Sequence, residues 1–509
     1  MGRCTTSLSL SKQLSLSSST FNIESMLSLS AIAILCLAGA PEVLAAPATF
    51  PNANTPPPAD VNMTMSVESC SSRMNGKLPP FIPTGFNYSG TTRRYYVKAE
   101  EVEWDYIPSG ENMTQLPGNL SPSSADTLLR TGWDNMRGVP VDESPVADGS
   151  DYIPSNTSIG HKYIKGLFRG YTSSNYSTLS SQPDWLGFQG PLMRGEVGDM
   201  VEVMLYNDLQ IATHPVSMHS MGLHYSPKSE GSMYYRGVDA NGTAVSYSGD
   251  AIQPGECFVY KWLIPESSAP DAGLPSKLWS YHGDVNLLND VMAGFFGPFI
   301  AYNRGQMESV MAKYAKEFVM YFSTSVESQS YYLNDNVAKY LPDQTFDAQS
   351  GAPVPVPTSS QNETVWGNIY NDLPPIGSNA TLAQSFMTIN GFAYANMPTL
   401  QMCQDDDVIW HIWSMGSFND GYHSAHGNNV QTASGANMAQ LSLLPASMTS
   451  VVMSAANVGL WQFLCHVAAH WQMGMQVNYN ITTSGTSESC PAKAASNVTS
   501  ASLTTSIIG

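Results

Sequence analysis

Two segments of the chain alternate apolar and polar residues in the same way, each directly after a turn. In EVGDMVEVMLYN the alternating apolar residues begin at Val201, and in DDDVIWHIW they begin at Val408. A period of two residues is typical of a strand with one face buried. The pattern therefore predicts two comparable strands in different parts of the chain.

The same plan continues after both strands. A histidine lies 20 residues after an aspartate of the turn in each case, at Asp199 and His219 and again at Asp406 and His426. A later turn and strand, PGECFVYKW or PASMTSVVM, then leads to YHGD in the first segment and to LCHV in the second. A repeat of this kind predicts an all-β chain with two homologous β-sandwich domains.

The remaining regions complete the expected layout. The apolar stretch MLSLSAIAILCLAGAPEVLAAPA, which begins at Met26, has the length and the small-residue exit of a signal peptide. Aperiodic stretches rich in Pro, Gly, Ser and Asn are expected to be surface loops or a mobile arm, at 46–91, 107–158 and 346–382. We expect a presequence at 1–46, an N-terminal arm at 47–91, domain one at 92–303, domain two at 312–483 and a flexible tail at 484–509.

Charge and glycosylation signals favour a secreted protein. The 509 residues have a formal net charge of −19 and only 12% are charged, which argues against a nucleic-acid partner. We expect the extracellular space, with an organelle lumen or the cell surface as alternatives. Asn-x-Ser/Thr triplets fit a glycosylated secretory product, and they begin at Asn62, Asn87, Asn112, Asn119, Asn156, Asn175, Asn241, Asn362, Asn379, Asn480 and Asn497.

The cysteines fit an oxidising compartment. Two of the seven fall in the presequence, and if Cys465 binds metal, four remain that can form two disulfides. Three pairings are possible among Cys70, Cys257, Cys403 and Cys490. We favour a bond between Cys70 and Cys490, which would join the two ends of the mature chain.

Candidate metal ligands gather near the end of domain two. The run WQFLCHVAAHWQMGMQV contains Cys465, His470 and Met475, and His423 lies 42 residues before Cys465. One thiolate, two imidazoles and an axial thioether form a type 1 (blue) copper site, because this set suits both Cu(I) and Cu(II). Domain one has no such ligands at the positions that correspond in the repeat, which are Val216, Gly283 and Phe295.

Most of the mature chain, about 90–480, resembles a known family. The resemblance is carried by TTRRYYVKAEEVEWDYIPSG, YIKGLFRGYTSSNYSTLSSQPDWLGFQGPLMRGEVGD, MHSMGLHYSPKSEGSMY, WSYHGDVNLLNDVMAGFFGPFIAYNRG, FMTINGFAYANMPTL and LCHVAAHWQMGM. These segments are similar to ceruloplasmin and hephaestin, the animal multicopper ferroxidases, and to the A domains of coagulation factors V and VIII. The resemblance implies two cupredoxin-like Greek-key domains, where ceruloplasmin and hephaestin have six.

The resemblance also implies three further coppers, which four paired-histidine motifs hold at a domain interface to reduce dioxygen. Each motif here keeps one histidine, in His219-Ser-Met, His282-Gly-Asp, His426-Gly-Asn and Leu-Cys-His466. His219 and His426 match type 2 copper ligands, and only His282 and His466 remain for the type 3 pair. We expect one type 1 copper and ligands for one additional copper, with Asp284 as a candidate proton donor.

Other positions argue against iron oxidation. The iron ligands of the family correspond here to Ala383, Thr388 and Ala469, which offer neither a carboxylate nor an imidazole. Four further histidines match no ligand of the family and are interpreted as structural, namely His161, His214, His224 and His411.

These features together predict a secreted copper oxidoreductase of multicopper-oxidase type. Electrons from a small reductant or a redox protein would enter at the type 1 copper and pass through Cys465 and His466 to an interdomain copper site. If that site needs domain one of one chain and domain two of another, a ring of three subunits, a homotrimer, is the natural closed arrangement. Two alternatives are a non-catalytic copper-binding, electron-carrier or adhesion protein, and a mononuclear type 2 copper enzyme of nitrite-reductase style.

Overall fold

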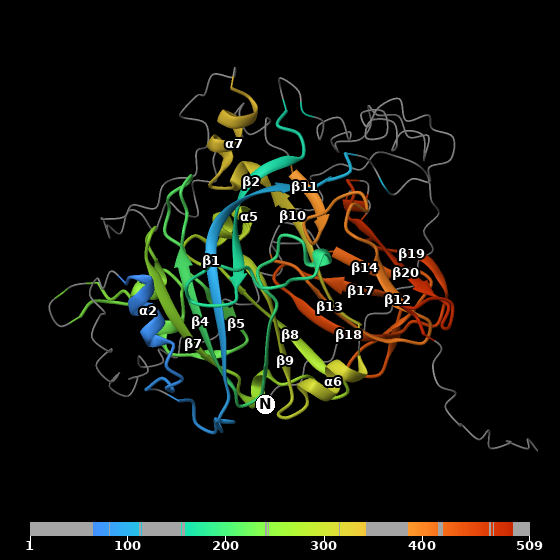
Figure 1. Cartoon of the computed structure of the whole chain (residues 1–509), viewed down its shortest axis with the longest axis horizontal. Helices are drawn as coiled ribbons and strands as arrows, with labels where there is room; N and C mark the ends of the chain where they lie inside the picture. Colours follow the sequence, from blue (N-terminus) through green and yellow to red (C-terminus); the bar gives the residue numbers. More distant parts are fainter. Residues whose placement is uncertain are drawn as a thin grey trace, which may run out of the picture. The chain divides into compact units, whose positions relative to one another are not determined.

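β-Strands are the main regular structure in the part of the chain that the structure describes. This computed structural model describes residues 65–80, 82–110, 113, 154, 158–239, 242, 244–314, 316–342, 385–415, 421–467, 470–471 and 473–491, apart from the side chains of 421–425. The strands of these residues form four sheets, which Figure 1 shows as successive layers across the molecule.

The first two sheets are built from residues 92–302. A five-stranded sheet has the order β2-β1-β4-β7-β6, and a four-stranded sheet has the order β3-β9-β8-β5. Their strands are β1 (Thr92–Asp105), β2 (Lys162–Tyr171), β3 (Met193–Glu196), β4 (Met200–Asn207), β5 (His219–Met221), β6 (His224–Tyr225), β7 (Cys257–Leu263), β8 (Ser276–His282) and β9 (Phe296–Tyr302).

The other two sheets are built from residues 316–482. A six-stranded sheet has the order β11-β10-β13-β18-β15-β16, and a five-stranded sheet has the order β12-β20-β19-β14-β17. Their strands are β10 (Lys316–Val326), β11 (Ser385–Ile389), β12 (Leu400–Cys403), β13 (Asp407–Trp413), β14 (Gly421–Ala425), β15 (Val430–Gln431), β16 (Asn437–Met438), β17 (Gln440–Leu443), β18 (Met448–Ser454), β19 (Gly459–Cys465) and β20 (Gln476–Thr482).

Both pairs of sheets follow one topology. β1 pairs antiparallel with β2 and parallel with β4, and β10 pairs in the same way with β11 and β13. The partner sheets repeat as β3-β9-β8-β5 and β12-β20-β19-β14. The prediction of an all-β chain with two cupredoxin-like sandwich domains is confirmed. The domain boundaries at 303 and 312 remain a prediction.

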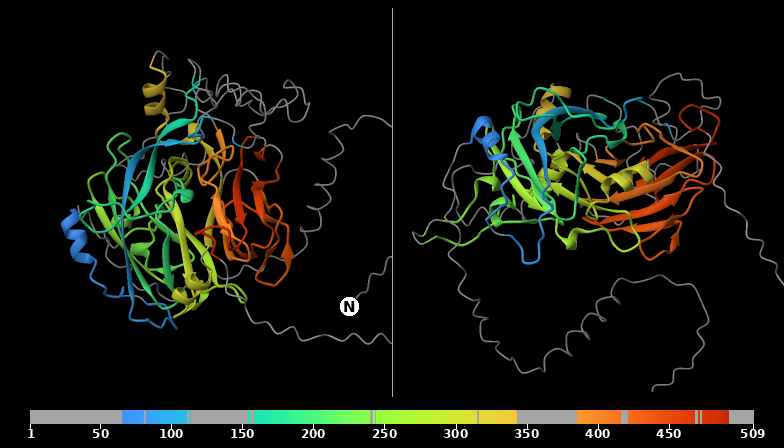
Figure 2. Two further views of the ribbon diagram at one scale, coloured as in Figure 1. Left: turned by 45° about the vertical axis from the view of Figure 1, so that its right-hand side comes forward. Right: turned by 60° about the horizontal axis from the view of Figure 1, so that its bottom comes forward.

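Alternating side chains hold the four sheets in one stack. On β13, Trp410 packs into the core of the second sandwich, whereas Ile409 and Trp413 face the first sandwich. On β8, Tyr281 packs into the first core and Leu278 faces the second sandwich. The four-stranded sheet therefore packs on the six-stranded sheet, with one five-stranded sheet on each outer side. Figure 2 shows the two sandwiches side by side from two further directions.

The helices among the described residues are short and lie outside the sheets. They are α2 (Val67–Arg73), α5 (Leu287–Ala293), α6 (Met307–Lys313) and α7 (Leu333–Tyr340), and the 3-10 turns are η4 (Asp184–Leu186), η5 (Pro227–Ser229), η6 (Ser248–Asp250), η7 (Glu266–Ser268) and η8 (Glu327–Gln329). No helix within the described ranges is both long enough and apolar enough to cross a membrane.

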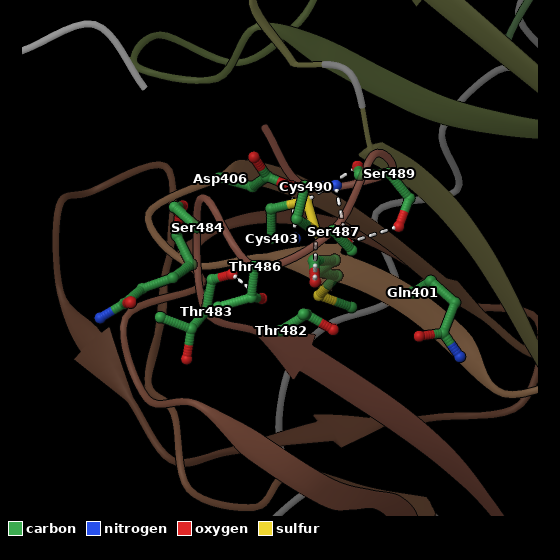
Figure 3. Close-up of a disulfide and its surroundings, with 12 residues drawn as sticks. Gln401, Cys403, Asp406, Thr482, Thr483, Ser484, Thr486, Ser487, Ser489 and Cys490 are labelled. Atoms are coloured by element: carbon green, nitrogen blue, oxygen red, sulfur yellow. Dashed lines mark hydrogen bonds between the residues drawn. A yellow bond between two sulfur atoms is a disulfide. The ribbon is translucent and has the colours of Figure 1, made fainter. Parts of the chain in front are cut away.

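Two disulfides correct the favoured pairing of the cysteines. Cys70 of α2 is bonded to Cys257 at the start of β7, and Cys403 at the end of β12 is bonded to Cys490. Figure 3 shows the second bond, where the chain beyond β20 turns back toward Cys403. The favoured bond between Cys70 and Cys490 is wrong, because each terminal segment is joined to a strand of its own sandwich. Cys465 lies in neither bond, as predicted.

Parts of the predicted arm and tail make defined contacts. The hydroxyl of Ser66 accepts a hydrogen bond from the backbone N–H of Ser69 and caps α2. At the other end, Ser484 donates to the carbonyl of Gln404. Within the predicted arm, residues 67–73 thus form a helix, and Ser484 of the predicted tail contacts the second sandwich. The bounds of the arm and of the tail remain predictions. The presequence, the rest of the arm and tail, most of 107–158 and all of 346–382 lie outside the described residues.

Candidate metal centre

The predicted type 1 ligands lie in the core of the second sandwich. Cys465 ends β19 with its side chain fully buried, because alternate residues of this strand face the core. His470 and Met475, which follow on the loop before β20, are also buried. The Sγ atom of Cys465 lies 3.6 Å from Nδ1 of His470. The structure thus brings together three of the four predicted ligands.

Backbone hydrogen bonds fix the loop that carries these ligands. The N–H of Met475 donates to the carbonyl of His470 over 3.0 Å, and the N–H of Cys465 donates to the carbonyl of Met475 over 3.1 Å. Gly474 turns the chain with a φ of +98°, and a Cβ atom there would lie 2.8 Å from the backbone nitrogen of Tyr394. The fold itself therefore holds the ligand loop in place.

The sulfur–nitrogen distance fits a shared metal. With bond lengths of about 2.3 Å to sulfur and about 2.0 Å to nitrogen, a metal in trigonal or tetrahedral geometry separates the two ligand atoms by roughly 3.5–3.8 Å. Burial lowers the pKa of the His470 imidazole, which favours the neutral form that binds metal. The backbone of His423, in β14, pairs with Cys465 in β19, but the side chain of His423 lies outside the described part of the structure.

An aromatic side chain fills the corresponding place in the first sandwich. Phe295 is fully buried, and its ring lies 5.2 Å from the ring of Phe168 and 5.7 Å from the imidazole of His214. Val216, at the position that corresponds to His423, is buried as well. Aromatic and aliphatic side chains thus fill these two positions in the first sandwich.

Two of the further candidate histidines meet in the first sandwich. His219 of β5 and His282 of β8 face each other across the strand pair, and their ring centroids are 5.2 Å apart. The Nδ1 of His282 donates to the carbonyl of Gly283 over 2.8 Å, and the Nδ1 of His219 donates to the carbonyl of Glu230 over 2.9 Å. A neutral imidazole that donates from Nδ1 keeps a lone pair on Nε2. Both rings are therefore prepared to bind a metal through Nε2.

Burial lowers the pKa of one histidine in each pair. It lowers the pKa of His282 to about 4, and the neighbouring His219 adds to this effect. In the second sandwich, burial and then the nearby His466 lower the pKa of His426. The ring centroids of His426 and His466 are 5.6 Å apart. The structure therefore forms one histidine pair in each sandwich and does not join His219 to His426.

The two histidine pairs belong to different layers. His219 and His282 lie in the four-stranded sheet, and His466 directly follows β19 in the outer five-stranded sheet, with the six-stranded sheet between these layers. Because packed sheets are about 10 Å apart, the two pairs are separated by roughly 20 Å within one chain. One chain cannot place both pairs around the same metal.

Asp284 is connected to His219 of the first pair through the hydroxyl of Ser232. Its Oδ2 accepts a hydrogen bond of 2.5 Å from the Oγ of Ser232, and this Oγ lies 2.9 Å from Nδ1 of His219. The carboxylate therefore reaches His219 from the side opposite Nε2. Ser232 was not identified from the sequence, because it lies in an aperiodic loop, SEGSMYYRG, without any ligand motif.

The structure also describes the environments of the four histidines that were interpreted as structural. His161 contacts Asp105 over 2.6 Å, and His411 lies fully buried between Glu317 and Ser450. The ring of His214 stacks on an aromatic neighbour in the first sandwich, and His224 is exposed on β6.

Of the three positions expected to lack iron ligands, the structure describes Thr388. Thr388 is fully buried on β11, and its hydroxyl donates to the carbonyl of Ser323. Ala383 and Ala469 lie outside the described residues. Among the described side chains, no group of three or more His, Cys, Asp and Glu residues is placed to hold a metal ion.

Sequence comparisons find relatives with matching segments along most of the chain. Human hephaestin is 30% identical over 398 residues, which cover 77% of this chain and 29% of hephaestin. Human ceruloplasmin is 28% identical over 391 residues, which cover 76% of this chain and 31% of ceruloplasmin. Ferroxidase HEPHL1 of Mus musculus is 27% identical over 394 residues. The chain thus spans about 30% of the length of these relatives.

Comparisons of structure find more distant similarities. A multicopper oxidase, mgLAC, gives a TM-score of 0.45 at 15% identity, covering 78% of this chain and 88% of that one. Copper nitrite reductase from Nitrosomonas europaea gives 0.44 at 12% identity, covering 77% and 94%. No protein-family model matches the chain. The family assignment rests on the sequence relatives, which make this chain a member of the multicopper oxidase family, distantly homologous to hephaestin and ceruloplasmin.

Proposed function

We propose that this protein is a secreted copper oxidoreductase that accepts electrons at a type 1 copper held by His423, Cys465, His470 and Met475. The observation that carries the proposal is the 3.6 Å separation between the buried Sγ of Cys465 and Nδ1 of His470. Copper bound there would supply one-electron redox chemistry. A small reductant or a redox protein is the proposed electron donor.

The surroundings of these ligands suit electron transfer. Cys465 and Met475 pack within the apolar core of the second sandwich, which excludes water from the thiolate. The hydrogen bonds of the loop from His470 to Met475 keep the ligands in place in both oxidation states. His466 follows Cys465 directly and lies beside His426, so the chain offers a covalent path from the thiolate to a second histidine pair.

A second copper would need two chains. The pair His219 and His282 and the pair His426 and His466 lie in sheets roughly 20 Å apart, so each pair is half of a site. A ring of three subunits would place domain one of one chain against domain two of the next and complete three equal sites. This homotrimer is part of the proposal, as is secretion, which the two disulfides favour.

A Cys465→Ser variant tests the proposal. We expect the copper-loaded wild-type protein to show the intense visible absorption and the narrow EPR hyperfine splitting of type 1 copper. The serine variant should lose both, because a hydroxyl does not replace the thiolate bond to copper. A Ser484→Ala variant, changed outside the core, should keep both signals. An unchanged spectrum in Cys465→Ser contradicts the proposal.

Metal content and turnover then separate the alternatives. About one copper per chain without oxygen consumption favours an electron carrier or an adhesion protein. A second copper with a type 2 EPR signal and nitrite-dependent turnover favours an enzyme of nitrite-reductase style. Oxygen consumption with phenols supports an oxidase, whereas oxygen consumption with Fe(II) would contradict the expected loss of the iron site.

A further inference from the structure

Ser232 and Asp284 lie behind the imidazole of His219 and continue its hydrogen-bond network. Asp284 occupies a position where the resemblance places a metal-binding histidine, yet its carboxylate accepts a hydrogen bond from Ser232. We infer that Asp284 and Ser232 are positioning residues, which keep the proton of His219 on Nδ1 and leave Nε2 free for copper. This inference rests on the proposed second copper site.

The direction of the network follows from the chemistry of its ends. A carboxylate only accepts hydrogen bonds, so the single hydroxyl proton of Ser232 points to Asp284 over 2.5 Å. The Oγ of Ser232 is then left as an acceptor, 2.9 Å from Nδ1 of His219. Nδ1 also faces the carbonyl of Glu230 over 2.9 Å. Two acceptors at Nδ1 require that this atom carries the proton.

The backbone turn that presents these acceptors is specific. Gly231, between Glu230 and Ser232, has a φ of +73°, and a Cβ atom there would lie 2.4 Å from the carbonyl oxygen of Met218. Only glycine adopts this conformation in so little space. The turn therefore places the carbonyl of Glu230 and the hydroxyl of Ser232 on the same atom of His219.

A partly buried arginine, Arg236, stabilises the turn through its guanidinium group. Arg236 donates to the carbonyl of Ser232 over 2.8 Å and to the carboxylate of Glu230 over 2.9 Å. The same guanidinium donates to Asp250, a buried residue of η6, over 2.6 Å. Because Arg236 joins both sides of the turn to η6, the position of Ser232 is set by the fold and does not depend on bound copper.

His282 provides an internal comparison. Its Nδ1 donates to the carbonyl of Gly283 alone, and no side-chain partner at this Nδ1 is among the hydrogen bonds of the described residues. Loss of Asp284 should therefore change the tautomer of His219 and leave that of His282 as it is. Outer-sphere partners of metal-binding histidines typically contribute about 10–100-fold in metal affinity.

Three variants of the full-length protein test the inference. In Asp284→Ala the hydroxyl of Ser232 loses its acceptor and competes to donate to Nδ1, so His219 should shift toward the tautomer with its proton on Nε2. In Ser232→Ala the carbonyl of Glu230 alone keeps the proton on Nδ1. The double variant Asp284→Ala/Ser232→Ala should therefore resemble Ser232→Ala. Simple structural damage predicts instead that the double variant is at least as impaired as Asp284→Ala.

Two measurements report the effects of these variants on the histidine tautomers and on copper affinity. Nitrogen-15 NMR of the copper-free protein, at a pH where both rings are neutral, reports the tautomers of His219 and His282. Competition with a chelator reports the affinity for the second Cu(II), which should fall about tenfold or more in Asp284→Ala and recover in the double variant. Asp271→Asn, an exposed surface change, is the control, and the type 1 absorption verifies folding.

The outcomes separate this inference from the proposed function. An unchanged His219 tautomer in Asp284→Ala overturns the inference, even if a second copper binds. A wild-type protein that binds only the type 1 copper overturns the proposed second site, while the NMR comparison still decides what Asp284 and Ser232 do. A double variant with the same tautomer shift as Asp284→Ala also overturns the inference.

Discussion

Glu317 joins the two sandwiches through a buried polar network. Its carboxylate accepts hydrogen bonds from Arg194, from Tyr302 over 2.8 Å and from Ser276 over 2.7 Å, all from the first sandwich. His411 of β13 lies 2.8 Å from the same carboxylate. Although burial alone would raise it, His411 and Arg194 hold the pKa of Glu317 well below its usual value. The charged form of Glu317 therefore stabilises the folded chain.

We expect Glu317→Gln to destabilise the protein by about 3–5 kcal/mol at neutral pH, because the change leaves the partly buried Arg194 and the fully buried His411 beside a neutral amide. The pKa of Glu317 is lower in the folded chain than in the unfolded chain. Its stabilisation is therefore fully present above the unfolded pKa and is lost as the pH falls toward the folded pKa.

Calorimetry at a series of pH values checks this prediction. The difference in Tm between wild type and Glu317→Gln should be largest at neutral pH and should shrink as the solution is acidified below about pH 4. Glu308→Gln, on the exposed side of α6, should show little difference at any pH. A constant difference across the series would show that Glu317 does not act through its charge.

Among the elements, α2 depends most on a covalent bond. It has only seven residues, too few to form a stable helix alone, and Cys70 attaches it to β7. We expect Cys70→Ala/Cys257→Ala to lower the stability by about 2–5 kcal/mol and to leave the type 1 absorption unchanged, because the bond lies in the other sandwich from Cys465. Denaturant unfolding, monitored by fluorescence, measures the first effect.

A peptide map without reduction tests the pairing itself. It should recover Cys70 joined to Cys257 and Cys403 joined to Cys490, with Cys465 open to alkylation after unfolding. A peptide that joins Cys70 to Cys490 would contradict the structure.

Sequence patterns predicted the long strands better than the connections between elements. The alternation beginning at Val201 and at Val408 is local, and it predicted β4 and β13. The two-residue strands β6, β15 and β16 are too short to give a periodic signal. The pairing of Cys70 depends on which strand lies beneath α2, and this tertiary relation leaves no trace in cysteine spacing.

The candidate site likewise has residues that sequence spacing predicts and residues that it does not. Cys465, His470 and Met475 are close in sequence, so their spacing alone predicted that they would meet. Ser232 reaches His219 only through the turn at Gly231, and no ligand motif marks it. Its proposed role follows from the hydrogen bond to Nδ1 of His219. Any acceptor at this distance favours the tautomer with the proton on Nδ1, so no particular residue type marks the position in the sequence.

At the scale of the whole molecule, the proposed trimer predicts a contact at the outer face of β19. Leu460 is 65% exposed there, and alternation along the strand places it on the same face as Leu464, away from the core that contains Phe463 and Cys465. Within β19, Leu460 is the exposed apolar side chain that a second copy in the proposed trimer would cover.

We therefore expect Leu460→Glu to convert the trimer to monomers and to remove the second copper while the type 1 absorption stays. Light scattering and copper content measure both effects. Ile82→Glu, a similarly exposed apolar residue outside the sheets at 45% exposure, should leave the assembly intact. A Leu460→Glu trimer with full copper content would exclude this face as the subunit contact.

The apolar layer between the sandwiches has a consequence for how this chain is made. Val319, Tyr321 and Ile409 on one side and Ile300 and Tyr302 on the other are covered only when both halves are present. During synthesis, we expect the apolar face of the first half to stay uncovered until the second half folds against it. We therefore expect each half to be more stable in the presence of the other, although each has the topology of a complete sandwich.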